Sequence, residues 1–193
     1  MKTLLKTFLF LLCMLVMLPV TVLFFILKPL SNEDELLSAF SQGISLLPGK
    51  IGSYLRAGFY RFALTHCAPD ALIGFGTLFS HCDTDIHRGV YIGPQSNIGK
   101  CAIGENTLLG SGVHVMSGKG QHNFDDDTMP IKDQGGTFAK VTIGANCWVG
   151  NAALIMANVG AGSVIAAGAV VVDDIPENAI AVGNPAKVVK YRR

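Results

Sequence analysis

The sequence has almost no excess of charge of either sign, and its cysteines are not paired. Its 193 residues contain 15 Lys and Arg against 14 Asp and Glu, a formal net charge of +1. This balance gives no electrostatic reason to expect a nucleic-acid partner. The absence of CxxC spacing argues against a disulfide framework or a structural metal site, and favours a reducing compartment. The five single cysteines are Cys13, Cys67, Cys82, Cys101 and Cys147.

Most of the chain also lacks the 3.6-residue period of a helix and the two-residue alternation of a strand. Instead, a branched apolar residue followed by a tiny one recurs about every six positions, as in IGANCWVGNAALIMANVGAGSVIAAGAVVV at residues 143–172. The period predicts a solenoid in which each unit forms a flat side and a corner, with the apolar residue inside and the small one at the bend. Upstream, the expected inward residues are Ile73, Phe79, Ile86, Ile92, Ile98, Ile103, Leu109 and Val115.

An uncharged apolar run, Thr7 to Leu27, stands between Lys6 and Lys28 near the start of the chain. As a helix rising about 1.5 Å per residue it would span roughly 30 Å, the hydrocarbon core of a bilayer. No small-x-small cleavage site follows it, so a removable signal peptide fits less well. We therefore expect a membrane anchor over residues 1–28. Pro19 lies near its middle, which leaves a spanning helix and a re-entrant hairpin open.

Residues 29–69 predict two short amphipathic helices, separated by Pro48-Gly49 and preceded by Ser31 or Asn32 as a cap. Two roles remain open for them. They either contact anionic lipid headgroups or cover the open end of the solenoid, as solenoids require. The basic side chains available for headgroups are Lys50, Arg56 and Arg61.

The expected solenoid domain covers residues 70–193, and its repeat is interrupted once, by a loop at residues 116–140. Long excursions from a rigid scaffold are usually functional or disordered. This loop places His122 shortly before an acidic trio, Asp125 to Asp127. It is the strongest candidate for chemistry in the chain.

The hexads, the loop GKGQHNFDD, the unit NCWVG and the ending VVVDDIPENAIAVGNPAKVVK follow one another in a familiar order. Together they resemble the left-handed parallel β-helix acyltransferases, the hexapeptide-repeat family, and in particular its sugar and polysaccharide O-acetyltransferase branch. The similarity covers about residues 70–190. It implies an all-β, left-handed parallel β-helix, here preceded by the expected membrane helix and amphipathic helices. It also implies a homotrimer with active sites between neighbouring chains.

The resemblance implies transfer of an acetyl group from acetyl-CoA to a hydroxyl of a saccharide, in surface polysaccharide or lipid-linked glycan biosynthesis. The family's catalytic base falls on His122. An alcohol needs such help because it is a poor nucleophile, and an imidazole with an ordinary pKa of about 6.5 supplies roughly 10²- to 10⁴-fold as a general base. We expect direct transfer, with one of Asp125 to Asp127 or a backbone carbonyl orienting the ring.

For the co-substrate acetyl-CoA, the resemblance assigns Asn151 and Ala167 to the pantetheine arm and Lys187 and Lys190 to the phosphates. Cations in the last residues suit a phosphate-rich ligand, although a solvated basic tail is the simpler interpretation. One position departs from the family: Asp173 stands where many members have a lysine, which removes an expected phosphate contact. No metal ion is expected.

Three alternatives remain. Covalent transfer through Cys147 is disfavoured because a small buried residue is ordinary at a coil position. A zinc enzyme like the gamma-class carbonic anhydrases would need converging histidines, whereas His81, His87 and His114 fall on different units. A catalytically silent, membrane-tethered scaffold would not need the loop histidine. His81 either lines the acceptor pocket or is an ordinary histidine, and Trp148 should point outward at a subunit interface or coenzyme groove.

The expected membrane anchor bears on where in the cell the catalytic domain lies. Because acetyl-CoA is cytosolic, we expect the catalytic domain on the cytoplasmic face of the inner membrane. The expected acceptor is then a membrane-associated saccharide, such as a lipid-linked glycan intermediate. The sequence does not identify that saccharide or the position acetylated.

Overall fold

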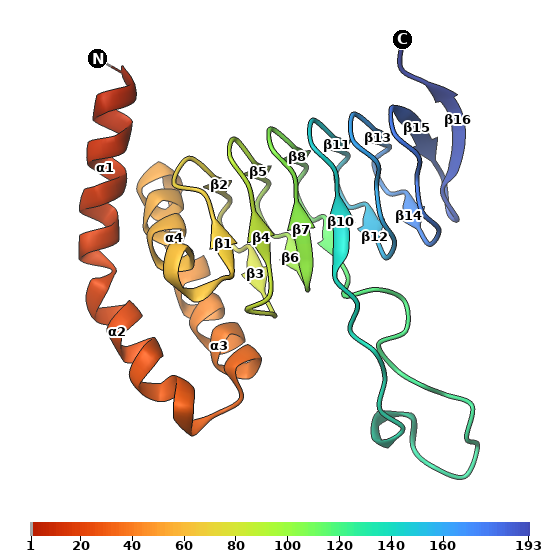
Figure 1. The fold of residues 1–193 in the computed structure, drawn as a ribbon, viewed down its shortest axis with the longest axis horizontal. Coiled ribbons are helices and arrows are strands. Elements are labelled where there is room, and N and C mark those ends of the chain that lie inside the picture. Colours follow the sequence, from red (N-terminus) through yellow and green to blue (C-terminus); the bar gives the residue numbers. More distant parts are fainter. Residues whose placement is uncertain (1) are drawn as a thin grey trace.

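The computed structural model describes residues 2–193 and shows a parallel β-solenoid closed at one end by helices (Figure 1). Successive short strands fall in turn on three flat sides, and every strand pair is parallel except β15–β16. Sheet A has the order β1 (His66–Cys67), β4 (Asp85–Ile86), β7 (Cys101–Ile103) and β10 (Val141–Ile143). Sheet B has the order β2 (Leu72–Ile73), β5 (Tyr91–Ile92), β8 (Leu108–Leu109), β11 (Trp148–Val149), β13 (Val164–Ile165), β15 (Ala179–Val182) and β16 (Lys187–Tyr191). Sheet C has the order β3 (Leu78–Phe79), β6 (Asn97–Ile98), β9 (His114–Val115), β12 (Leu154–Ile155) and β14 (Val170–Val171).

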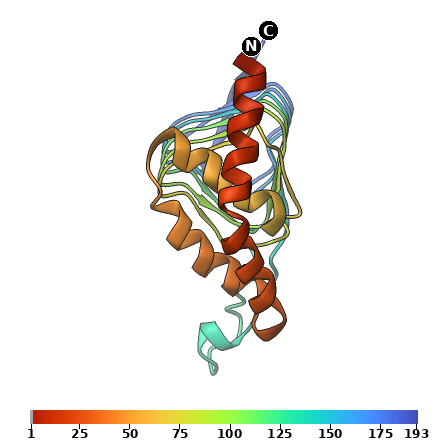
Figure 2. The ribbon, with the colours of Figure 1, turned by 90° about the vertical axis from the view of Figure 1, so that its left-hand side faces the viewer.

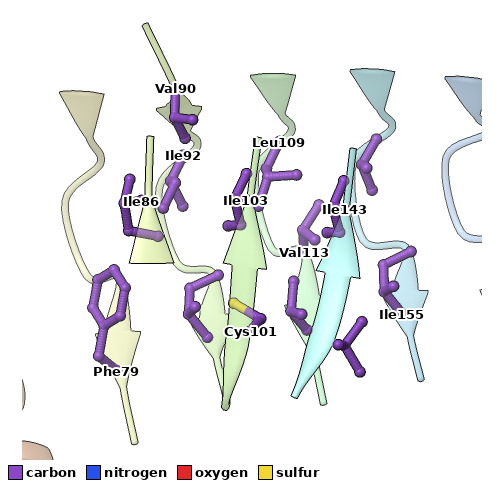
Figure 3. Close-up of a cluster of buried hydrophobic side chains, with 14 of the residues drawn as sticks. Phe79, Ile86, Val90, Ile92, Cys101, Ile103, Leu109, Val113, Ile143 and Ile155 are labelled. Carbon is purple, nitrogen blue, oxygen red and sulfur yellow. The ribbon is translucent and has the colours of Figure 1, made fainter. Parts of the chain in front are cut away.

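The core is a stack of inward side chains, one or two from each strand except β16, which is exposed throughout. All eight predicted inward residues between Ile73 and Val115 are exposed by 2% or less. Figure 3 shows several of them, among them Ile92 and Leu109, lying beside one another within the coils together with Ile143. The predicted β-solenoid is confirmed, and its left-handed sense stays a prediction.

The six-residue step is not kept everywhere: it is seven residues from Phe79 to Ile86, five from Ile98 to Ile103, and it is shortened again after Ile155. Here Val159 takes the inward position, since it is 2% exposed and bridges Ile143 on one side and Ile175 on the other. The step from Ile155 to Val159 is thus two residues short, and the repeat resumes in phase from Val159 to Ile165. The local irregularity therefore leaves the stack of coils intact.

The predicted single membrane helix is not formed. The apolar run instead gives α1 (Lys2–Val16) and α2 (Leu18–Leu27), followed by a 3₁₀ turn, η1 (Lys28–Leu30). No single helix in residues 2–193 is both long and apolar enough to cross a membrane; the joined segments Lys6–Val16 and Leu18–Leu30 pass that test of length and composition only as a pair bent by 47°. Pro19 lies in the first turn of α2 and lacks the N–H of an unbroken helix, which accounts for a break at this place.

The next two helices, α3 (Glu33–Ser45) and α4 (Gly49–Ala63), cover the first coil. Figure 2 shows α1 crossing in front of them, with the stacked coils behind. Asn32 caps α3, because its Oδ1 accepts from Asp34 N (3.0 Å) and Glu35 N (3.2 Å). The two helices thus lie over the open end of the solenoid, which is one of the two roles that the sequence left open.

Polar side chains of this cap pair with the edge backbone of the first coil. Ser53 Oγ accepts from Ile73 N (3.0 Å), and Ser41 Oγ accepts from Phe79 N (2.8 Å). Asp34 Oδ1 accepts from Cys82 N (2.7 Å), at the corner that follows β3. Because unpaired edge groups would otherwise be buried or left open to other strands, these contacts terminate the sheets.

Arg56 fastens α4 to the first coil. It is 1% exposed, and its Nε and Nη2 donate to Ile73 O at 3.1 and 2.9 Å, while Nη1 donates to Leu47 O at 2.5 Å. The expectation that Arg56 meets lipid headgroups is therefore wrong. Its guanidinium instead satisfies carbonyl groups that α4 and the coil enclose.

Neighbouring coils approach so closely at their corners that a methyl group has no room. A Cβ on Gly144 would lie 2.5 Å from Ala161 N, whereas one on Gly43 in α3 would meet no atom within 4 Å. We expect Gly144→Ala to lower the free energy of unfolding by about 1–3 kcal/mol, measured by urea denaturation. Gly43→Ala should be neutral or stabilise by about 0.5–1 kcal/mol. Equal effects of the two substitutions would contradict corner stacking as the constraint.

Candidate active site

Residues 116–140 leave the coils after β9 and return at β10 as a projecting loop (Figure 1). The two halves of the loop run side by side. Thr137 N donates to Gly120 O (2.7 Å), and Asn123 N donates to Gly135 O (2.9 Å). A 3₁₀ turn, η2 (Ile131–Asp133), lies within it. These bonds give the loop a defined shape although it projects from the coils.

The returning end of the loop is held by charge. Lys140 Nζ contacts the carboxylates of Asp83 and Asp85, the latter at 2.6 Å, and Asp83 also pairs with Lys100 at 3.1 Å. Burial opposes the charge on Lys140, but the hydrogen bonds to the two carboxylates outweigh it and raise the pKa of Lys140. The bond from Lys140 lowers the pKa of Asp83. The root of the loop is therefore fixed at neutral pH.

His122 lies exposed in the loop and makes no hydrogen bond or ion pair with another residue among residues 2–193. The acidic trio does not orient its ring in the single chain. Asp126 is engaged locally, because its carboxylate accepts from Thr128 N (2.8 Å) and Thr128 Oγ1 (2.6 Å), and the Thr128 hydroxyl bond is the main cause of its lowered pKa. The imidazole thus stays open to a ligand or to another chain.

A cavity of about 200 Å³ adjoins the loop at the residue that precedes His122. It is bounded by α3, by the outer face of sheet C and by the loop itself. Its polar lining is uncharged and consists of hydroxyl and amide groups, which can both donate and accept hydrogen bonds. The side chains that face it include Ser38, Ser80, Asn97, Met116, Ser117 and Gln121.

His81 lies behind this cavity. Its Nδ1 is 2.9 Å from Ser80 Oγ and 3.4 Å from Ser117 Oγ, and its ring centroid is 5.3 Å from that of Phe138. Its Nε2 faces Asp34 Oδ2 at 4.0 Å. The residue therefore supports two of the serines that line the cavity, and connects the helical cap with the loop.

A second cavity, of about 410 Å³, lies on the outer face of sheet B. It brings together two of the predicted coenzyme residues, Asn151 and Ala167, beside Trp148. Asn151 Oδ1 accepts from Ser111 N at 3.0 Å, so its side chain is fixed in place. Trp148 is 57% exposed and points outward, as expected.

The other two predicted coenzyme residues lie farther along the same face. Lys190 of β16 pairs with Ile180, which is in register with Val164 and Trp148, so all four side chains point outward from sheet B. Lys187 lies on the same strand and is likewise exposed. Arg192 is instead used structurally, because its Nη1 donates to Gly162 O at 2.6 Å.

One chain does not bring all of these residues into a single site. The loop with His122 leaves from the corner between sheets C and A, whereas Asn151 and Ala167 lie on sheet B. No cavity among those found in residues 2–193 contains residues from both regions. The predicted catalytic and coenzyme residues therefore form two separate groups on the single chain.

Cys147 is buried, and its Sγ donates to Gly160 O at 3.2 Å. Burial raises the pKa of this thiol, which disfavours the thiolate needed for covalent transfer. Within residues 2–193, no three His, Cys, Asp or Glu side chains come together as a metal-binding group.

Asp173, the position that departs from the family, borders a further cavity of about 530 Å³ at the base of the loop. Lys119 Nζ bridges Asp173 Oδ1 (3.5 Å) and Val172 O (3.2 Å). The neighbouring Asp174 accepts from Asn158 N at 2.9 Å. Asp173 thus contacts the outgoing end of the loop.

Sequence reasoning missed Ser80, Asn97 and Gln121 as possible site residues. Ser80 follows the inward Phe79 and Asn97 precedes the inward Ile98, so the hexad marks both as outward-facing. Which outward residues share a cavity depends on the loop and α3, and the repeat does not encode it.

Comparisons with known proteins point to one fold. A maltose O-acetyltransferase from Clostridium difficile superposes with a TM-score of 0.66 at 20% identity, covering 84% of this chain and 90% of that one. A galactoside acetyltransferase in complex with coenzyme A gives a TM-score of 0.56 at 19% identity, covering 83% of each chain. This chain has the hexapeptide-repeat fold of the acetyltransferases. The resemblance seen in the sequence is thereby confirmed.

The sequence relatives are named as acetyltransferases. A probable acetyltransferase of Mycobacterium tuberculosis is 40% identical over 93 residues, covering 47% of this chain and 30% of the relative. A putative acetyltransferase of Saccharomyces cerevisiae is 56% identical over 52 residues, 26% of each protein. The chain therefore matches less than half the length of these curated relatives. No protein-family model matches it.

Proposed function

We propose that this chain is a coenzyme A-dependent O-acetyltransferase that acetylates a hydroxyl of a saccharide. The observation that carries the proposal is the exposed loop histidine, His122. It directly follows Gln121, which lines a small cavity of uncharged hydrogen-bonding groups. Acetyltransferases among both the sequence relatives and the fold neighbours support it. The fold alone would not, because folds host many activities.

The proposed chemistry is one direct displacement. The neutral imidazole of His122 accepts the proton of the acceptor hydroxyl while its oxygen forms a bond to the thioester carbonyl carbon. The carbon–sulfur bond breaks, and the thiolate of coenzyme A takes up a proton, so that an acetyl ester and a free thiol are the products. The raised pKa of Cys147 favours this route over an acyl-cysteine.

The acceptor is proposed to occupy the cavity beside Gln121. At about 200 Å³, it is smaller than the pockets of roughly 300–1,000 Å³ that enclose drug-sized ligands, which suits a single sugar ring. Ser80 and Asn97 offer it hydroxyl and amide groups without charge. Neutral donors and acceptors of this kind match the hydroxyls of a sugar.

Acetyl-CoA is proposed to lie along the outer face of sheet B. Asn151 and Ala167 border the cavity for the pantetheine arm, and a small side chain at residue 167 leaves it open. Lys187 and Lys190 lie farther along this face with charge available for phosphate groups. Asp173, the residue that differs from the family pattern, borders the cavity at the base of the loop and not the face of sheet B. It therefore lies apart from Lys187 and Lys190.

Joining the two groups of residues requires more than one chain, and we take the arrangement to be a homotrimer with its sites between neighbours. The outer face of sheet B supports this, because Leu72, Tyr91, Leu108 and Trp148 form an apolar row exposed by 39–57%. An exposed apolar row of this kind is typical of an interface between protein chains. The loop also exposes Phe124 and Ile131.

The proposed place of action is the cytoplasmic face of the inner membrane, where acetyl-CoA is available. A membrane-associated glycan intermediate is then the natural acceptor, as part of surface polysaccharide or lipid-linked glycan biosynthesis. The two N-terminal helices are what connects this chain with a membrane.

His122→Ala should lower kcat for acceptor-dependent thiol release from acetyl-CoA by about 10²- to 10⁴-fold, because the hydroxyl loses its general base. The measurement is thiol release against a panel of sugars and lipid-linked saccharides. The control is His87→Ala, an exposed histidine on the coils, which should retain wild-type turnover. If no acceptor elicits release from the wild-type protein and no coenzyme binds, a silent scaffold becomes the better interpretation.

Trp148 is the only tryptophan and borders the proposed coenzyme cavity, so at a fixed protein concentration, with the assembly unchanged, its fluorescence reports on that cavity. Coenzyme A should change the emission of the wild-type protein saturably. Ala167→Leu should weaken that binding at least tenfold by filling the cavity, while Ala102→Leu on the outer side of sheet A should not. Equal affinities for both variants would place coenzyme A elsewhere.

Asn97→Ala should raise KM for the saccharide about tenfold or more and leave KM for acetyl-CoA unchanged, because one amide partner of the sugar is lost. Steady-state kinetics with each substrate varied in turn separates the two. A matched rise in KM for acetyl-CoA would mean that this cavity does not hold the acceptor.

A further inference from the structure

The helices α1 and α2 have one covered stripe and a wide uncovered surface. The covered stripe packs on α3 and α4 and consists of Phe10, Cys13, Met17, Thr21 and Phe24, none more than 7% exposed. Around it the large apolar residues are 46–63% exposed. They are Phe8, Leu11, Leu12, Leu15, Val16, Leu18, Val22, Leu23, Phe25 and Ile26.

This surface is more uniformly apolar than a protein interface. At roughly 100 Å² for each half-exposed side chain, it presents on the order of 1,000 Å² of apolar area, beyond the few hundred Å² that monomers expose. Protein interfaces carry a polar rim, but here no charged residue interrupts the chain between Lys6 and Lys28. Hydrocarbon is the environment that suits a helix surface of this kind on all of its uncovered sides.

The same helices are packed on the helical cap of the solenoid rather than standing free of it. α1 packs along α4 and α2 packs on both α3 and α4, while Arg56 and Ser53 tie α4 to the first coil. A spanning α1–α2 would have to draw these polar contacts into the hydrocarbon or abandon its packing. Each helix is also short, about 22 Å for α1 and 15 Å for α2 at roughly 1.5 Å per residue, against a core of about 30 Å.

We propose that α1 and α2 lie in the plane of the membrane interface, as a monotopic attachment that keeps both chain termini on one side of the bilayer. The occupant of the uncovered surface is the acyl-chain region of a lipid leaflet. The helices cross one end of the solenoid (Figures 1 and 2), so the coils stand out from the membrane with β16 farthest from it.

The consequence for substrates rests on the proposed function. The cavity proposed for the acceptor includes Ser38 of α3 and strands near the helical cap, whereas the cavity proposed for coenzyme A lies on β11 and β13, farther along the coils. A lipid-linked acceptor would thus enter from the membrane end, and coenzyme A from the aqueous end.

The first test is flotation of the purified full chain with phosphatidylcholine vesicles, with and without phosphatidylglycerol. The wild-type protein should float with both. The double variant Leu15→Asp with Ile26→Asp should reduce the bound fraction at least tenfold, because charges enter the proposed hydrocarbon contact. The matched control is Ile131→Asp in the loop, equally exposed at 56%, which should bind as wild type.

Folding is checked by thermal melting, and these exposed substitutions should leave Tm unchanged. The second test adds the chain, with an epitope before residue 1, to preformed sealed vesicles. Protease outside should remove the epitope from the bound protein.

Protection of the epitope inside the vesicles would show a spanning helix and overturn the proposal. The proposal would also be overturned if the wild-type protein failed to float. If it then self-associated and the double variant did not, the surface would be assigned to a second copy of the chain. Neither readout depends on acetyl transfer, so failure of the membrane attachment is distinguishable from failure of the proposed activity.

Discussion

The close approach of one coil to the next is the constraint on which the rest of the structure depends. Hydrogen bonds between parallel strands set the spacing, and at the glycines that directly follow inward residues such as Ile143 and Val149 this leaves no room for a Cβ. A methyl on Gly150 would lie 2.4 Å from Ala167 N, much as at Gly144. Small residues are therefore needed at the bends and branched apolar residues inside, which is the six-residue pattern. The outward positions are left free, and the candidate site is built from them.

A stack of parallel coils has two open ends, and each is closed differently. At the first coil, Ser41, Ser53 and Arg56 pair with backbone groups that have no preceding coil to meet. At the last, β16 turns back antiparallel to β15 and carries the basic residues of the tail. The helical cap is thus part of the solenoid's architecture, and α1 and α2 rest on it. The apolar run is consequently tied to the coils rather than free to insert as an independent anchor.

The proposed activity is distributed over parts that the coils hold at fixed separations. The loop carries His122, sheet C and α3 provide the cavity beside Gln121, and sheet B provides the surface with Asn151 and Ala167. Because the coils are rigid, these parts cannot move together within one chain. Assembly between neighbouring chains is the arrangement that would unite them, and the exposed apolar row on sheet B is the surface available for it.

The sequence by itself determined the solenoid, the inward residues and the position of the loop, because each is written in a local period or its interruption. Val159 shows its limit, since that residue becomes inward through pairing with Ile143 and Ile175 rather than through its place in the repeat. Only the tertiary structure decided that Arg56 is buried, because the partners of its guanidinium include the Ile73 carbonyl of the first coil, 17 residues away. It also decided that the apolar run bends and packs on α4, and that Ser80 and Asn97 share a cavity with Gln121. Those outcomes depend on which surfaces meet in space, and no pattern along the chain records that.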